Sequence, residues 1–158
     1  SVVATMRHEA SHAILFSLSQ LVPDWLNEGM AEQMETLDEQ GGRFLIQRHQ
    51  ANARGVGYYR EQLLPVLDFV EVRNGQWRHG NQMGMNQVMA GQLVYLMLST
   101  RYGRDCITRL LQDYKRGVNK RSFYLLDQHY IGGAAALRLH WNRWLATDMQ
   151  QPASVILE

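Results

Sequence analysis

Two histidines four residues apart mark the segment where the sequence most clearly indicates chemistry. Residues 8–12 read His-Glu-Ala-Ser-His. On an α-helix, His8 and His12 lie about 40° apart around the axis and about 6 Å apart along it. Both imidazoles can then reach one ion at Zn–N distances of about 2.0–2.1 Å. Glu9 lies at the edge of the same face, where it can take a proton from metal-bound water without binding the metal. The spacing predicts a hydrolytic metal site, although the same residues could also be ordinary core and surface positions.

A catalytic zinc ion normally has three protein ligands and one position for water, so a third ligand is needed. The longer metzincin pattern requires glycine at position 15 and histidine at position 18, and both positions are leucine. Cys106 is possible, but it lies in an ordinary helical pattern. The better candidate is Glu28, which follows His12 by sixteen residues, enough for a turn and an antiparallel return to the first helix.

Glu28 belongs to the segment Trp-Leu-Asn-Glu-Gly-Met-Ala-Glu at residues 25–32. If this segment is helical, Glu28, Glu32 and Glu35 share one face, at positions i, i+4 and i+7. Gly29 costs about 1 kcal/mol in a helix interior relative to alanine, so it predicts that the first two helices approach closely beside it. On an isolated helix, three glutamates would more simply form a solvated face. Their distance from the two histidines favours a metal ligand.

The two motifs together resemble those of the gluzincin zinc peptidases. The closest similarity is to the bacterial peptidase-MA-like group, whose second motif is W-L-x-E-G-x-A-x-x-x-E. The resemblance implies that His8, His12 and Glu28 bind zinc and that Glu9 is the general base. It is specific over residues 8–35 and continues weakly through the helical tail of the chain.

The same resemblance implies neighbouring groups that orient the ligands. Glu32 occupies the position where gluzincins often carry a carboxylate that holds a ligand histidine, and Asn27 directly precedes Glu28 in the motif. Such a partner fixes the tautomer and the orientation of the imidazole. We therefore expect Glu32 and Asn27 to support the metal ligands.

Substrate binding in gluzincins usually uses the edge of a β-sheet that precedes the H-E-x-x-H helix. Only seven residues precede the motif here, so we expect that sheet to be missing from this chain. A small hairpin near residues 66–79 is a possible substitute, because Asn74-Gly75 is a strong two-residue turn signal. An irregular loop is the alternative for this segment.

Peptide hydrolysis also benefits from a donor to the negative charge that develops on the carbonyl oxygen. In the look-alike group a tyrosine often begins the helix that corresponds to residues 86–101, where this chain has Asn86. We select His79 as the substitute because it precedes that helix in a glycine-bounded loop. The other candidates are Tyr95, Tyr102, His129 and Tyr130.

Helical patterns dominate the chain and predict a mainly α fold, a helical zincin domain in which an active-site helix faces a glutamate helix. The expected helices cover residues 2–18, Pro23 to just before Gly41-Gly42, 43–54, 86–101, 104–115, 121–130 and 134–146.

Length and composition favour one domain, residues 1–158, with a real hydrophobic core. The net charge of +1 argues against a nucleic-acid binder. The single cysteine excludes an intrachain disulfide and a multi-cysteine zinc site. No apolar run approaches the roughly 18–20 residues of a membrane span. No signal peptide is recognised either. We interpret the chain as part of a longer protein, and the resemblance favours an exported or membrane-tethered location in a bacterium.

The sequence therefore predicts a zinc-dependent hydrolase, most simply a peptidase that acts on a peptide or protein substrate. One alternative is a helical interaction domain that retains the peptidase architecture but does not cleave. Another is a zinc hydrolase acting on a non-peptide amide, since the same ligand set polarises any carbonyl. The sequence predicts neither the cleavage specificity nor the oligomeric state.

Overall fold

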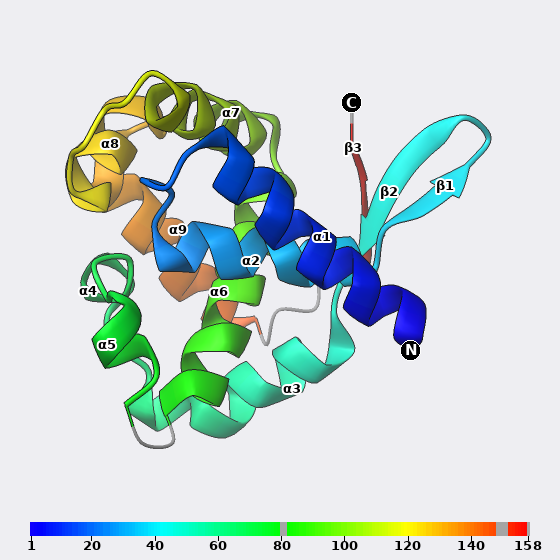
Figure 1. Ribbon diagram of the computed structural model, residues 1–158. Helices are drawn as coiled ribbons and strands as arrows, with labels where there is room; N and C mark the ends of the chain where they lie inside the picture. Colours follow the sequence, from blue (N-terminus) through cyan, green and yellow to red (C-terminus); the bar gives the residue numbers. More distant parts are fainter. Residues whose placement is uncertain (80–81, 148–151, 158) are drawn as a thin grey trace.

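The structure is a computed structural model that describes residues 1–79, 82–147 and 152–157. It is mainly helical with one small sheet, as the sequence predicts (Figure 1). The helices are α1 (Val2–Leu18), α2 (Asp24–Glu35), α3 (Gln50–Tyr59), α4 (Val66–Phe69), α5 (Asn74–Trp77), α6 (Gln82–Leu98), α7 (Arg101–Lys115), α8 (Ser122–His129) and α9 (Gly133–Ala146), with a 3-10 turn at Arg60–Gln62. The strands are β1 (Asp38–Gln40), β2 (Arg43–Gln47) and β3 (Ser154–Leu157).

The first two helices begin where the sequence indicates. Ser1 caps α1, and its side chain accepts a hydrogen bond from the Ala4 backbone N–H at 3.1 Å. Pro23 precedes α2, and Asp24 places a negative charge in the first turn, where it complements the helix dipole. The second helix ends at Glu35, several residues earlier than predicted.

The predicted helix at residues 43–54 is wrong in its first half. Residues 43–47 are the strand β2, which pairs with β1 across a turn where Gly41 and Gly42 adopt φ values of 59° and 77°. Strand β3 pairs antiparallel with the other side of β2. The following helix, α3, runs through Gly55, where a Cβ would lie 2.8 Å from Val88 Cγ1 of α6. This glycine therefore permits close packing within a helix and does not end one.

The predicted hairpin near residues 66–79 is also wrong, because this segment forms the short helices α4 and α5. Val66, Phe69 and Val70 are buried, at spacings of three and four residues that match a helix. Phe69 also packs on Trp77, with ring centroids 5.6 Å apart. This burial outweighs both the β propensity of the segment and the turn signal at Asn74-Gly75. The sheet that this chain does form follows α1 in the sequence.

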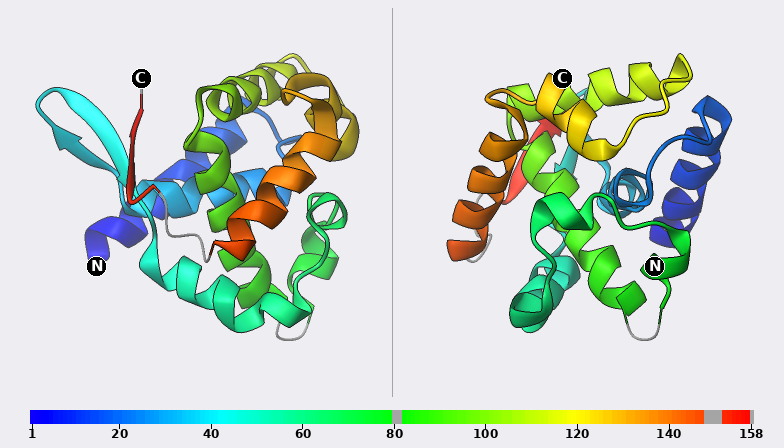
Figure 2. Two further views of the ribbon diagram at one scale, coloured as in Figure 1. Left: turned by 180° about the vertical axis from the view of Figure 1, so that it is seen from behind. Right: turned by 90° about the vertical axis from the view of Figure 1, so that its left-hand side faces the viewer.

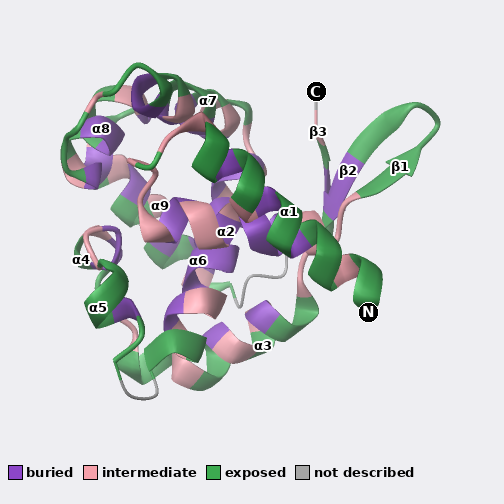
Figure 3. Cartoon of the chain, viewed as in Figure 1, coloured by how far each residue is buried: buried purple, intermediate pink, exposed green. Residues whose placement is uncertain are grey.

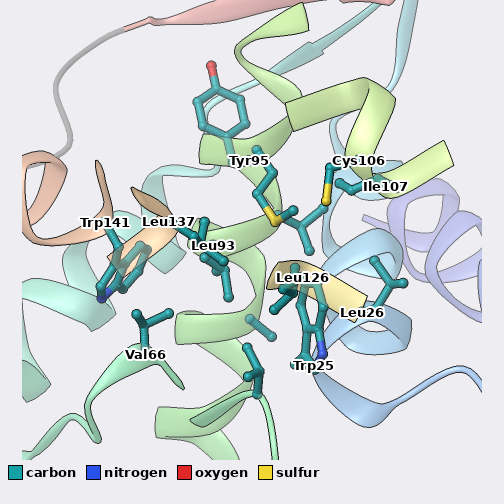
Figure 4. Packing of buried hydrophobic residues seen from close by; sticks show 14 of the residues in the cluster. Trp25, Leu26, Val66, Leu93, Tyr95, Cys106, Ile107, Leu126, Leu137 and Trp141 are labelled. Carbon is teal, nitrogen blue, oxygen red and sulfur yellow. The ribbon is translucent and has the colours of Figure 1, made fainter. Parts of the chain in front are cut away.

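Helix α6 runs through the centre of the molecule and packs against α2, α3, α7 and α9 (Figures 1 and 2). Its buried residues meet those of the surrounding helices in one core, and Leu93 lies near its centre (Figure 4). Trp25 of α2 is fully buried there, and its Nε1–H donates to Ser122 Oγ of α8 at 3.0 Å. This core fixes the position of α2, and α1 packs against α2.

The outer face of α1 is exposed (Figure 3) and includes large apolar side chains such as Met6, Ile14 and Phe16. Even so, none of the helices in the described ranges combines the length and apolar character needed to cross a bilayer.

Candidate metal centre

The three predicted ligands come together where α1 and α2 pack antiparallel. Glu28 Oε2 lies 3.7 Å from His8 Nε2 and 3.6 Å from His12 Nε2. The two imidazole rings stand almost perpendicular, with centroids 4.8 Å apart. One ligand atom from each residue lies within 4.8 Å of the other two. Tetrahedral zinc with bonds of about 2.0–2.2 Å needs ligand atoms roughly 3.5 Å apart, so this donor set fits the ion.

Both histidines are also held by a hydrogen bond at Nδ1, the ring nitrogen that does not face Glu28. His8 Nδ1 lies 2.7 Å from Glu35 Oε1, and His12 Nδ1 lies 2.9 Å from Asn27 Oδ1. Carboxylate and amide oxygens only accept hydrogen bonds, so each neutral ring carries its proton on Nδ1. The Nε2 lone pairs are then free to face Glu28. Asn27 thus makes the contact expected of a residue that supports a metal ligand.

Glu32 does not make the contact that the sequence assigned to it. Its Oε1 lies 3.7 Å from His8 Nδ1, which is too long for a hydrogen bond. The buried Glu32 carboxylate instead accepts hydrogen bonds from Asn52 Nδ2 at 2.6 Å and Gln87 Nε2 at 2.7 Å. Glu35 is the carboxylate that holds His8. It is also the final glutamate of W-L-x-E-G-x-A-x-x-x-E, so the sequence did carry a signal for it.

The cluster opens into a cavity of about 450 Å³. Residues of α1 and α2 line it, namely His8, Glu9, His12, Asp24, Asn27 and Glu28, together with Asn74 and Trp77 of α5, Arg78, and Met83 and Gln87 of α6. The Glu9 side chain is exposed and adjoins the two histidines, where it can reach a water molecule in the cavity. Arg78 brings a positive charge to this lining, and this charge acts on the nearby Asp24 carboxyl.

Burial is the main cause of the pKa shifts of Glu28 and Asp24, the two half-buried carboxyls in the cavity. It raises the pKa of Glu28, while His12 and His8 oppose the increase and Glu32 adds to it. It also raises the pKa of Asp24, and the nearby guanidinium groups of Arg78 and Arg73 lower it in part. Burial disfavours an unpaired carboxylate charge, so a cation between Glu28 and the histidines would be favourable there.

The residues predicted to stabilise an oxyanion lie elsewhere. His79 is exposed and lines a second cavity of about 490 Å³ together with Asp68 and Asn86. Asn86 is buried and donates to the carbonyl oxygen of Trp77 at 3.1 Å. Neither residue is in the lining of the metal cavity. The same holds for Tyr95, Tyr102, His129 and Tyr130.

Cys106, the alternative third ligand, is also outside the cluster. Cys106 lies on α7 and is buried in the hydrophobic core of the molecule. Burial raises the pKa of its thiol to about 12. Its side chain therefore has the environment of an unreactive core thiol rather than that of a zinc thiolate.

Sequence analysis missed three polar residues that surround the ligands. His49 Nε2 lies 2.9 Å from Glu35 Oε2, and Asn52 and Gln87 hold Glu32. These residues come from the start of α3 and from α6, far from the two motifs in the sequence. No spacing rule connects them to His8 or Glu28, and only the packing of α3 and α6 on α2 brings them together.

Comparison of the chain with protein-family models, with curated proteins and with solved structures gave no match.

Proposed function

We propose that this protein is a zinc-dependent hydrolase, most simply a peptidase. The observation that carries the proposal is the convergence of His8 Nε2, His12 Nε2 and Glu28 Oε2 within 4.8 Å of one another. Two imidazoles and one carboxylate are a typical donor set for catalytic zinc, whereas calcium and magnesium prefer oxygen donors alone. The hydrogen bonds of Glu35 and Asn27 to the far nitrogens support the proposal, because they fix the tautomers that metal binding requires.

The chemistry of the site follows from the positions of its side chains. A zinc ion held by His8, His12 and Glu28 would make a water acidic and would polarise the carbonyl oxygen of the substrate. Glu9 would accept the proton of the water as its oxygen bonds to the carbonyl carbon, and would deliver that proton to the amine nitrogen as the C–N bond breaks. We assign the stabilisation of the developing negative charge to Arg78, because this cationic residue lines the same cavity as the ligands.

The experiment compares parent protein and the Glu9→Gln variant after zinc loading, with a fluorescently labelled unfolded protein as substrate. We expect one zinc per chain in both proteins and a fall in turnover of about 10²–10⁴-fold in the variant, because glutamine cannot accept the proton. Glu39→Gln on the exposed strand β1 is the matched control and should keep parental activity. Cleavage by Glu9→Gln at the parental rate would contradict the proposed mechanism.

A second candidate function is a zinc-binding helical interaction domain that cleaves nothing. The position of His79 and the other predicted oxyanion donors away from the metal cavity favours this candidate. It predicts a zinc-loaded parent protein that leaves the unfolded substrate intact, and measurable cleavage by the parent that Glu9→Gln abolishes would exclude it.

A further inference from the structure

Glu35 lies between two histidines, only one of which is in the proposed ligand set. Its Oε1 is 2.7 Å from His8 Nδ1, and its Oε2 is 2.9 Å from His49 Nε2. The three residues come from α1, from the end of α2 and from the residue that caps α3. About a quarter or less of each side chain is exposed, with values of 11% for His8, 24% for Glu35 and 21% for His49. Hydrogen bonds to a charged group are strong in such a partly dry environment.

The start of α3 fixes the tautomer of His49. As the N-cap residue, His49 accepts a hydrogen bond at Nδ1 from the backbone N–H of Asn52, at 3.3 Å. A backbone N–H only donates, so Nδ1 presents its lone pair and the proton of the neutral ring lies on Nε2. The Nε2–H therefore donates to Glu35 Oε2.

This bond determines what Glu35 can do for His8. One carboxylate oxygen is occupied by His49, so the plane of the carboxylate is fixed and the other oxygen accepts from His8 Nδ1–H. Nε2 of His8 is then left without a proton and faces Glu28, as a metal ligand must.

The environment of Glu32 preserves this arrangement. Glu32 Oε2 is 3.9 Å from His49 Nε2, so it does not compete with Glu35 for that proton at hydrogen-bond distance. Asn52 and Gln87 donate to Glu32 instead. Gly91 makes room for these contacts, because a Cβ at that position would lie 2.5 Å from Asn52 Nδ2.

We propose that His49 is a positioning residue for the metal centre: through Glu35 it fixes the orientation and tautomer of His8. The inference rests on the proposed zinc site for its effect on metal binding, but the tautomers of His49 and His8 are properties of the metal-free protein. His49 does not line the cavity, and its ring is hydrogen-bonded to Glu35, so it acts on His8 through Glu35.

The first experiment separates this role from helix capping. In His49→Ser the serine hydroxyl can still cap α3, but it is too short to reach Glu35. We expect zinc affinity, measured by competition with a chromogenic chelator, to fall about tenfold, at the lower end of the usual 10–100-fold effect of such partners. The absorption spectrum of the Co²⁺-substituted protein should also change. His49→Gln can accept from Asn52 and donate to Glu35, so it should recover most of the affinity, and the exposed-residue control His79→Ser should match the parent.

The second experiment uses ¹⁵N–¹H NMR of the metal-free protein. We expect His49 as the Nε2–H tautomer and His8 as the Nδ1–H tautomer, with the His8 preference weakened in His49→Ser. The inference is overturned if His49 carries its proton on Nδ1, or if His49→Ser leaves zinc affinity and the Co²⁺ spectrum unchanged. A parent protein that fails to bind zinc would instead refute the proposed function, and the tautomers would still decide whether His49 orders His8.

Discussion

The three glutamates on one face of α2 have three different roles. Glu28 faces Nε2 of both histidines, Glu35 holds His8 and His49, and Glu32 is enclosed by amide donors from α3 and α6. Helical spacing places them on one face but does not set these roles. Each role depends on which neighbouring element lies opposite that turn of the helix.

A second carboxylate–histidine pair, far from the cavity, gives a prediction for stability at low pH. Asp113 of α7 is buried and accepts a hydrogen bond from His129 Nε2 at 2.6 Å, and Arg116 donates to its other oxygen. The His129 hydrogen bond lowers the pKa of Asp113 below its ordinary value of 3.8, burial opposes this shift, and Arg116 adds to it. Because the folded state has the lower pKa, the charged carboxylate stabilises the fold above pH 3.8, and this contribution is lost as the pH falls from there through the lowered pKa.

The check is urea unfolding of the parent and of Asp113→Asn between about pH 6 and pH 3. We expect the variant to be less stable at the upper end and to lose less stability than the parent as the pH falls. Equal losses in the two proteins would show that Asp113 is not a source of acid sensitivity.

For single residues, helix spacing predicted the His8–His12 pair, while Glu28 followed from the length of the connection and from the resemblance, and Asn27 from the resemblance. His8, His12 and Glu28 converge as expected, and Asn27 contacts His12. The contacts of His49, Asn52 and Gln87 could not be predicted, because they depend on how distant elements pack. The choice of Glu32 over Glu35 was a different error, since the motif itself contains Glu35.

Among the elements, α2 packs on both α1 and α6, which lie on different sides of it (Figure 1). Gly29 lies on the α6 side, where a Cβ would be 2.3 Å from Val94 Cγ2 and 2.6 Å from the carbonyl oxygen of Ala90. The predicted close approach of two helices at this glycine is present, but the partner helix is α6 and not α1. Close packing on α6 thus holds α2 where Glu28 can face α1.

Gly29→Ala should therefore destabilise the protein even though alanine is the better helix former. A backbone carbonyl cannot move aside as a flexible side chain can, so we expect a loss of about 2–3 kcal/mol in the free energy of unfolding. Gly57→Ala in α3 is the matched control, because a Cβ there meets nothing within 4 Å. It should stabilise the protein by up to about 1 kcal/mol. Chemical denaturation measures both, and an unchanged stability for Gly29→Ala would contradict the packing of α2 on α6.

The long helices α1, α7 and α9 lie close to their predicted bounds, whereas the helix predicted at 86–101 is α6, which begins at Gln82 and ends at Leu98. The errors fall on short segments where competing signals are present. At residues 43–47 the pairing of β2 with both β1 and β3 outweighs a weak helical pattern. At residues 66–77, burial of Val66, Phe69 and Trp77 outweighs the turn propensity of Asn-Gly. Strand β3 comes from residues 154–157, so its pairing with β2 is a long-range contact that local patterns do not report.

For the molecule as a whole, the core around α6 acts as a scaffold that presents the α1–α2 pair to the cavity (Figures 1 and 4). The rest of the cavity lining comes from Asn74 and Trp77 of α5, from Arg78, and from Met83 and Gln87 of α6. The three proposed zinc ligands thus all lie on α1 and α2, and on the proposed function the substrate would also meet α5, Arg78 and the start of α6.

The most direct test of the account is the zinc content and coordination of the purified chain. After reconstitution and removal of excess metal, the parent should hold one zinc per chain, and X-ray absorption should show two imidazole nitrogens with oxygen donors. His8→Ala and Glu28→Ala should each lose most of this zinc, while His79→Ala should retain it. A parent chain without bound zinc, or one that keeps it undiminished in both ligand variants, would contradict the metal centre on which the proposed function depends.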